Sequence, residues 1–306
     1  MTGPGENAAA APLLLIVGDV IDDVIVQPLG PVTPASDTRA RITPTPGGSA
    51  ANQAVWFAEA GARVRLAGRV GVADLERHDR TFVAAGVEPV LTGDPDLPTG
   101  SIVILVAPDG EHTMYTDRGA NLALSAGDLP DELFDGVAAL HLSGYSLFDP
   151  GVRGAVLDLV ARARRRGLPV SVDPGSIAFL TEVGPEAFLA WIDGVELLLP
   201  NLDEGRLLSG ADDPELVLAL LLDHAPVVAL TLGAGGALLG ARGEPSVHLP
   251  ALDVEVVDTT GAGDAFAGAF IAAWLTGEEL RAAGLRGIAA AGRAVTVPGA
   301  RPKVGS

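Results

Sequence analysis

Short apolar runs and amphipathic stretches alternate along most of the chain. The runs that predict strands lie at residues 13–17, 64–67, 138–142, 170–172, 197–199 and 227–231. The stretches with helical periodicity lie at residues 49–60, 77–85, 152–166, 186–192, 214–224, 262–275 and 280–295. Strands that are apolar on both faces need cover on both sides. The pattern therefore predicts an α/β fold, with a central, mostly parallel sheet flanked by helices on both faces. Ligands of such sheets bind beyond the carboxyl ends of the strands.

Two segments interrupt this alternation, at approximately residues 24–46 and 98–121. Their apolar and polar positions alternate, and Asp109-Gly110 marks a hairpin turn in the second segment. Together they predict a small β layer over the ligand site, or else ordinary surface hairpins. Residues 1–12 are expected to be a flexible tail before a single domain at 13–306. Ser49 is expected to cap the helix that it begins, and residues 254–257 are expected to form a strand before the helix at 262–275.

Composition narrows the classes of function. The chain has 39 acidic and 20 basic side chains, and its formal net charge of -19 opposes binding to nucleic acid and to anionic membranes. It has no cysteine, which excludes thiolate metal sites and cysteine nucleophiles. Its one lysine, Lys303, lies in no Walker loop. No segment has the length of a membrane span or the flanks of a targeting signal, so the sequence predicts a cytoplasmic protein.

The clearest chemical signal is the segment Asp258-Thr259-Thr260-Gly261-Ala262-Gly263-Asp264. Gly261, Ala262 and Gly263 lie at the expected N-terminus of a long helix, where backbone N–H groups and the helix dipole favour an anion such as phosphate. Asp264 follows in the first turn. A carboxylate beside a phosphate indicates a general base that deprotonates an attacking hydroxyl. The alternative is that Asp264 only caps the helix and the glycines only turn the chain.

Two further segments carry polar residues at the start of a predicted helix or after a predicted strand. Gly47-Gly48 opens an alanine-rich helix whose first turn carries Asn52, which is either a substrate-binding amide or a solvated residue. Asn201 and Glu204 follow an apolar strand and lie three residues apart, so they can reach phosphate and the water shell of a magnesium ion. The alternative is that Asn201 caps a helix and Glu204 is exposed.

Together these segments resemble the ribokinase-like family of carbohydrate kinases, also called the PfkB family. The segments that carry the resemblance are Gly18 to Asp23, Gly47-Gly48 to Asn52, Asn201 to Glu204, Thr231-Leu232-Gly233, Asp258 to Asp264, and Gly299-Ala300-Arg301-Pro302. The resemblance implies a ribokinase-like fold with a β lid, and an ATP-dependent kinase that phosphorylates a primary hydroxyl of a small sugar. The sugar would be of the ribose, fructose or keto-deoxy sugar acid class.

The resemblance also implies roles for individual residues. Asp264 would be the catalytic base, and the amides of Gly261, Ala262 and Gly263 would stabilise charge on the transferred phosphoryl group. The implied binding residues are Asp23, Gly48 and Asn52 for the acceptor, Asn201, Thr231 and Gly233 for the nucleotide, and Glu204 for magnesium through water. Asp258 and Thr260, with the backbone carbonyls of Ala294, Val297 and Gly299, could surround a potassium ion. The lid would form the interface of a homodimer.

Arg118, in the second lid segment, is expected to project into the sugar site. There it would bind an acidic acceptor, or else pair with the neighbouring Asp117. Two rival functions remain. A nucleoside kinase of the same family would need an apolar slot for the base, which Ile104, Tyr115 or Phe148 could provide. A catalytically silent sugar or nucleotide sensor would have no use for a base such as Asp264.

Overall fold

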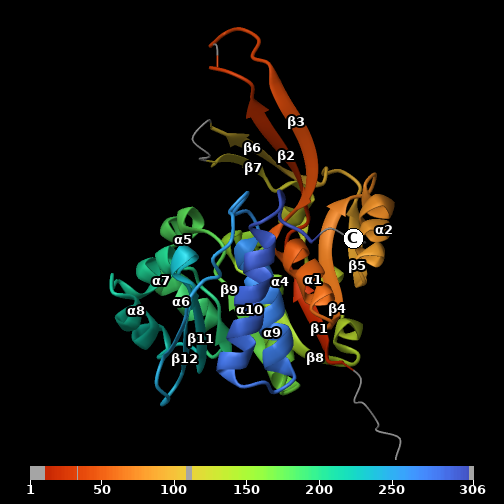
Figure 1. Ribbon diagram of the computed structural model, residues 1–306. Coiled ribbons are helices and arrows are strands. Elements are labelled where there is room, and N and C mark those ends of the chain that lie inside the picture. The colour runs from red at the N-terminus through yellow and green to blue at the C-terminus, as the bar shows by residue number, and fades with distance from the viewer. Residues whose placement is uncertain (1–10, 33, 108–111, 303–306) are drawn as a thin grey trace, which may run out of the picture.

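The computed structural model describes residues 11–32, 34–107 and 112–302. At its centre is a nine-stranded sheet with the strand order β13-β12-β11-β10-β9-β8-β1-β4-β5 (Figure 1). Neighbouring strands from β11 to β5 are parallel, whereas the pairs β11–β12 and β12–β13 are antiparallel. The predicted α/β fold is confirmed. The strands are β1 (Leu13–Val17), β4 (Arg63–Gly71), β5 (Val87–Asp94), β8 (Val137–Ser143), β9 (Val170–Asp173), β10 (Leu197–Leu198), β11 (Val227–Thr231), β12 (Ala237–Ala241) and β13 (Val247–Leu249).

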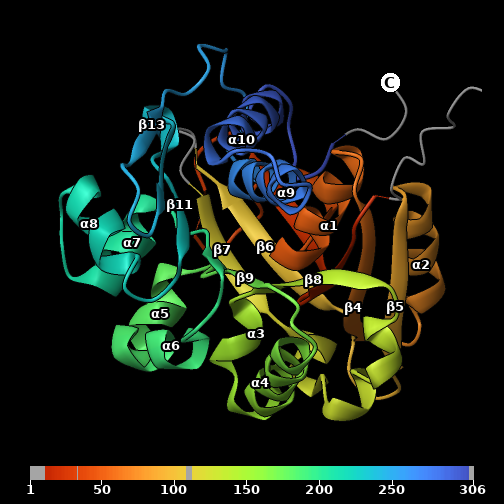
Figure 2. The same cartoon turned by 90° about the horizontal axis from the view of Figure 1, so that it is seen from below.

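Helices cover both faces of this sheet, which Figure 2 shows from below. One layer consists of α1 (Ser49–Glu59), α2 (Leu75–Ala84), α9 (Ala262–Leu275) and α10 (Leu280–Ala294). The opposite layer consists of α3 (Tyr145–Phe148), α4 (Pro150–Arg165), α5 (Ile177–Val183), α6 (Pro185–Ile192), α7 (Leu202–Ser209) and α8 (Pro214–Leu221). Short 3₁₀ turns complete the body at η1 (Gly119–Ala123), η2 (Ala126–Asp128), η3 (Asp131–Phe134) and η4 (Gly233–Gly235).

Strand β1 shows why the sheet needs both layers. Its side chains alternate between the two faces. Leu13, Leu15 and Val17 belong to the core on the α4 side, whereas Leu14 and Ile16 belong to the core under α1 and α9. All five side chains are buried. A continuous apolar run is therefore the sequence of a strand that is covered twice.

A second sheet of four strands projects from the body (Figure 1). Its order is β3-β2-β6-β7, and its strands are β2 (Ile21–Pro28), β3 (Ala40–Gly47), β6 (Gly100–Val106) and β7 (His112–Asp117). Strands β2 and β6 are parallel neighbours, so the two segments that interrupt the alternation join into one sheet. The expected turn at Asp109-Gly110 lies outside the described residues. The role of this small sheet as a lid stays a prediction.

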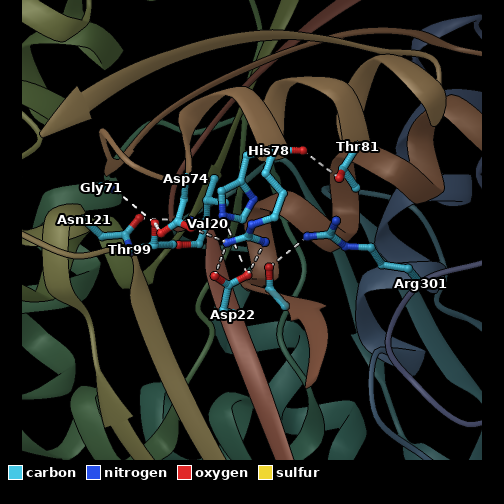
Figure 3. A network of polar contacts seen from close by, with 11 residues as sticks. Val20, Asp22, Gly71, Asp74, His78, Thr81, Thr99, Asn121 and Arg301 are labelled. Carbon is cyan, nitrogen blue, oxygen red and sulfur yellow. Dashed lines mark hydrogen bonds and ion pairs between the residues drawn. The ribbon is translucent and has the colours of Figure 1, made fainter. Parts of the chain in front are cut away.

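Polar contacts fix the base of the small sheet to helix α2 (Figure 3). Asp22, the second residue of β2, accepts a hydrogen bond from Arg77 of α2, with 3.0 Å between Oδ1 and Nη1. Thr99, just before β6, donates to Asp74 at the start of α2, with 2.8 Å between the oxygens. Both strands that enter the small sheet are thus held where they leave the body.

Two local predictions are wrong. Residues 254–257 form no strand, because the sheet ends at β13 and the N–H of Val257 donates to the carbonyl of Val295 instead of to a neighbouring strand. Ser49 does not cap α1. Gly48 holds that position with φ at 88°, and the Ser49 hydroxyl turns toward Asp264.

Candidate active site

A cavity of about 400 Å³ lies at the carboxyl ends of the central strands, where the small sheet meets the body. Asp173 at the end of β9 and Thr231 at the end of β11 line it from the body. Ile102 and Met114 line it from β6 and β7. This is the edge at which open parallel sheets bind ligands.

Asp264 lies on the wall of this cavity, in the first turn of α9. Its Oδ1 accepts a hydrogen bond from Ser49 Oγ at 2.9 Å, and its Oδ2 accepts one from Asn52 Nδ2 at 3.2 Å. The carboxylate is thus directed toward α1, and Gly261 occupies the N-cap position of α9. Burial and the nearby carboxylate of Asp173 raise the pKa of Asp264 to about 7, against the effect of its hydrogen bonds. A carboxyl group in this range can take up and release a proton near neutral pH.

The glycines before Asp264 have two different functions. Gly261 has φ at +75°, and a Cβ there would lie 2.6 Å from the Ala300 backbone. It lets the chain turn against the C-terminal segment. A Cβ on Gly263 would meet nothing within 4 Å among the described residues. Gly263 therefore leaves space beside Asp264, so a ligand can approach the N-terminus of α9 closely.

Asp23 and Gly48 line the same cavity as Asp264. The Asp23 side chain is buried beneath Gly47, where any Cβ would collide with the carboxylate. Within the described ranges, Asp23 Oδ1 has no hydrogen-bond partner. Burial raises the pKa of Asp23 to about 6, although Arg301 opposes the shift. A buried carboxylate oxygen without a partner is suited to a ligand hydroxyl.

Asn52 lines the same cavity beside Asp264, and it is 5% exposed. The interpretation of Asn52 as a solvated residue is wrong. Its Nδ2 donates to Asp264, and its Oδ1 accepts a hydrogen bond from Arg301 Nε at 2.8 Å. One amide hydrogen is left for a further acceptor.

Arg118 has a partner that the sequence analysis did not consider. Its guanidinium donates twice to the carboxylate of Asp19, with 2.8 Å from Nε to Oδ2 and 2.7 Å from Nη2 to Oδ1. Both side chains are buried, and Asp19 lines the cavity whereas Arg118 does not. The expected pairing with Asp117 is wrong, and the positive charge expected for an acidic acceptor is neutralised by Asp19.

A second cavity, of about 640 Å³, adjoins the first. Thr231, Thr259, Gly263 and Phe266 line both. Gly233 and Ala262 line only this second cavity. The structure therefore brings the predicted nucleotide residues Thr231 and Gly233 next to the glycines of α9.

Asn201 and Glu204 form a reciprocal cap at the start of α7. Asn201 Oδ1 accepts from the Glu204 N–H, and Glu204 Oε2 accepts from the Asn201 N–H, each at 2.9 Å. The capping interpretation of Asn201 is thus confirmed, but Glu204 is buried at 2% exposure instead of exposed. Both residues line the first cavity. Burial raises the pKa of Glu204, and burial together with the Glu204 carboxylate raises the pKa of Asp173.

Asp173, for which the sequence predicts no role, lines the cavity and interacts electrostatically with both Glu204 and Asp264. Its Oδ2 accepts a hydrogen bond from Gln53 Nε2 at 2.7 Å. Gln53 Oε1 in turn contacts His141 Nε2 at 2.8 Å, inside the body. The signal was available, because Asp173 follows a strand directly, but nothing in the sequence links it to Gln53.

The carboxylates of Asp173 and Glu204 suit a magnesium ion, which prefers oxygen ligands and keeps several of its waters. Among the described residues, no group of three or more acidic or histidine side chains is placed to hold a metal directly. Two carboxylates fit an ion that keeps several of its waters.

Among the residues predicted to surround potassium, Asp258 links Thr260 to Gly299. Its Oδ1 accepts from the Thr260 N–H at 2.8 Å, and its Oδ2 accepts from the Gly299 N–H at 3.0 Å. The carbonyl of Ala294 accepts from the Val297 N–H at 3.3 Å. Lys303 lies outside the described residues. A potassium ion at this loop stays a prediction.

Comparisons with known proteins agree with this geometry. A family model described as pfkB family carbohydrate kinase matches residues 11–304. The chain is 33% identical over 298 residues to the bifunctional protein HldE of Pseudomonas putida (strain W619). The match covers 90% of this chain and 59% of that protein. The chain thus spans less than two thirds of the relative that it matches.

Two solved structures have the same fold. The adenosine kinase from Sinorhizobium meliloti is 25% identical, with a TM-score of 0.86 and 96% of each chain covered. The Arabidopsis thaliana ribokinase complexed with ribose and ATP is 26% identical, with a TM-score of 0.76, covering 95% of this chain and 94% of that one. In the described part of the chain, no helix is long and apolar enough to cross a membrane.

Proposed function

The chain belongs to the pfkB family of carbohydrate kinases and is a phosphotransferase, and we propose that it transfers the γ-phosphoryl group of ATP to a primary hydroxyl of a small sugar. The observation that carries this proposal is the position of Asp264. It lies between the open N-terminus of α9 and the acceptor-side residues Asn52 and Asp23, in one cavity.

In the proposed reaction, Asp264 accepts the proton of the acceptor hydroxyl as that hydroxyl attacks phosphorus. The backbone at Gly263 stabilises charge on the transferred group, because the helix N-terminus favours an anion there. Asp23 orients the acceptor by accepting hydrogen bonds from its hydroxyls. Magnesium, held through water near Glu204, would neutralise the phosphate charge. Thr231 and Gly233 bind the nucleotide in the adjoining cavity.

The charges in the cavity favour a neutral acceptor over a sugar acid. Asp19 and Asp23 both present carboxylates, and the guanidinium of Arg118 is already paired with Asp19. Carboxylates accept hydrogen bonds from hydroxyls but repel an acidic substrate. The apolar side chains of Ile102 and Ile104 line the cavity beside Asp23, because Ile102 is the partner of Asp23 on the neighbouring strand. We therefore favour a polyhydroxylated sugar with one apolar face.

A nucleoside kinase is the second candidate. Ile102, Ile104 and Met114 give the cavity an apolar wall against which a base could pack. The similarity to an adenosine kinase supports the same alternative. A silent sensor is less consistent with the structure, since binding alone does not need a carboxyl group whose pKa is raised to about 7 beside the phosphate site.

The test is ATP turnover over a panel of acceptors. ADP release is measured with neutral pentoses, hexoses and heptoses, with sugar acids and with nucleosides. We expect acceptor-dependent ADP release with a neutral sugar. Fastest turnover with a nucleoside would select the second candidate. If calorimetry shows that ATP and a sugar bind but no member of the panel is phosphorylated, the protein is a sensor and the proposal fails.

A further inference from the structure

The C-terminal segment reaches back into the active site through Arg301. The two residues before it are anchored, because the carbonyl of Ala300 accepts from Trp56 Nε1 at 2.9 Å and the N–H of Gly299 donates to Asp258. The guanidinium of Arg301 then points inward, toward the strand that carries Asp22 (Figure 3). It lies over the ring of Phe82, 5.1 Å from the centroid. This packing fixes the position of the guanidinium group.

Arg301 binds both ends of the segment that opens α1. Its Nη2 donates to the carbonyl of Gly47 at 2.9 Å, and its Nε donates to Asn52 Oδ1 at 2.8 Å. It does not line the cavity itself, and its Nη1 is buried with no hydrogen-bond partner in the described ranges. Arg301 thus stands behind the cavity wall and acts on the residues that form it.

The contact with Arg301 determines how the Asn52 amide is oriented. A guanidinium can only donate, so the amide must present its oxygen to Arg301. The amide nitrogen then faces away from Arg301 and donates to Asp264 Oδ2 at 3.2 Å. One buried cation therefore restrains the side chain that holds Asp264 in place.

The positive charge of Arg301 also favours the carboxylate form of Asp264. Asp173 from β9 is the charged group with the largest effect on Asp264, and Tyr145 from α3 is nearby. Arg301 from the C-terminal segment interacts first with Asp23 and then with Asp264 and Asp22. Asp173 raises the pKa of Asp264, whereas the hydrogen bond from Asn52 lowers it. A positive charge nearby also favours the carboxylate.

We propose that Arg301 is a positioning residue for phosphoryl transfer, which orients the Asn52 amide and through it holds the Asp264 carboxylate toward the acceptor. The inference rests on the proposed role of Asp264 as the base. It assigns a function to an arginine that touches neither substrate. It also predicts that loss of Arg301 affects the chemical step more than acceptor binding.

The test is the kinetics of Arg301→Met at several pH values, with the acceptor that the wild type uses. Since small misplacements of catalytic groups cost up to about 100-fold, we expect kcat to fall by 10-fold or more, with a smaller change in acceptor KM. The acid limb of the kcat profile should move to higher pH, because the carboxylate loses stabilisation. Asn52→Ala should have a similar effect, and the double variant should be little worse than either single variant.

Arg293→Met is the matched control, because Arg293 pairs with Glu59 on the exposed side of α10. It should retain wild-type kinetics. If Arg301→Met does not fold, Arg301→Gln replaces it, since its amide can still donate to Asn52 but carries no charge, and it should show the same shift with a smaller loss of kcat.

Three results would overturn the inference: an unchanged kcat, a loss confined to acceptor KM, or a fall in kcat and melting temperature without a shift of the acid limb. Asp264→Asn is measured in parallel. If that variant keeps wild-type turnover, the proposed function itself fails. If only the Arg301 variants behave as wild type, the proposed function stands and this inference alone is wrong.

Discussion

Three aspartates at the start of the chain have three different environments. Asp19 pairs with Arg118, Asp22 pairs with Arg77, and Asp23 keeps an oxygen without a partner in the described residues. Side chains alternate along an extended segment, which puts Asp19 and Asp23 on one face and Asp22 on the other. In the structure both line the cavity, and Asp22 does not. The sequence could not predict which of the two would be neutralised, because Arg118 lies 99 residues away from Asp19.

Asp23→Ala is expected to weaken acceptor binding selectively. A hydrogen bond to a charged group contributes about 1.5–3 kcal/mol, which corresponds to roughly a 10- to 100-fold rise in acceptor KM. The KM for ATP should change little, because Thr231 and Gly233, two of the predicted nucleotide residues, line the adjoining cavity and Asp23 does not. Asp22→Ala is the control from the same strand and should leave acceptor KM near the wild-type value. An equal rise in both variants would remove Asp23 from the acceptor site.

The pH dependence of the reaction should follow Asp264. The free enzyme has the pKa of this group raised to about 7 by burial and by Asp173. Because only the carboxylate can accept the proton, kcat/KM should fall as the pH drops below 7 and level off above it. Steady-state rates between pH 5.5 and 9 at constant ionic strength check this. A flat profile down to pH 5.5 would show that no group with this pKa limits the reaction.

The helices and strands that the sequence predicts best are those whose own residues indicate them. Residues 262–275 were predicted as a helix with the bounds that α9 has, because a glycine turn precedes it and apolar positions fill it. Strand β5 was missed, since Pro89 and Gly93 interrupt its short apolar run. Strand β4 pairs with β5 along eight residues. The hydrogen bonds to β4 therefore stabilise a strand that its own residues do not predict.

Two glycine substitutions test whether the N-terminus of α9 binds phosphate. Gly263→Val adds a branched side chain where nothing lies within 4 Å in the described structure, so the fold should survive while phosphate is excluded. Gly261→Ala is the contrasting variant. Its Cβ would strike the Ala300 backbone at a φ of +75°, so it should lower the melting temperature. Circular dichroism and ADP release distinguish the two. A folded and fully active Gly263→Val protein would contradict the phosphate site.

At the scale of the whole molecule, the small sheet has two different faces. Asp23, Ile102 and Met114 face the cavity. Residues of the opposite face include Ile42, which is 63% exposed, and Tyr115, which is 62% exposed. The sequence predicted the β character of both segments. It could not show that β2 and β6 pair in parallel across more than 70 residues, because that contact exists only in the folded chain.

The exposed apolar face supports the expected homodimer through the lid. An uncovered apolar surface on an otherwise acidic protein favours self-association. Ile42→Glu should therefore shift the protein toward the monomer in sedimentation experiments. Arg41→Glu, on the same strand, is the control for added charge. A monomeric wild type at micromolar concentration would contradict the dimer and leave the kinase assignment unaffected.

If this chain is a kinase whose base is Asp264, the kcat of Asp264→Asn must lie far below that of the wild type. The amide keeps the size of the side chain but cannot take the acceptor proton. We expect kcat to fall by about 10²–10⁴-fold. The affinity for ATP, measured by calorimetry, should change little. Asp223→Asn, an exposed residue beyond α8, should behave as wild type. Near wild-type turnover in Asp264→Asn would show that Asp264 is not the catalytic base.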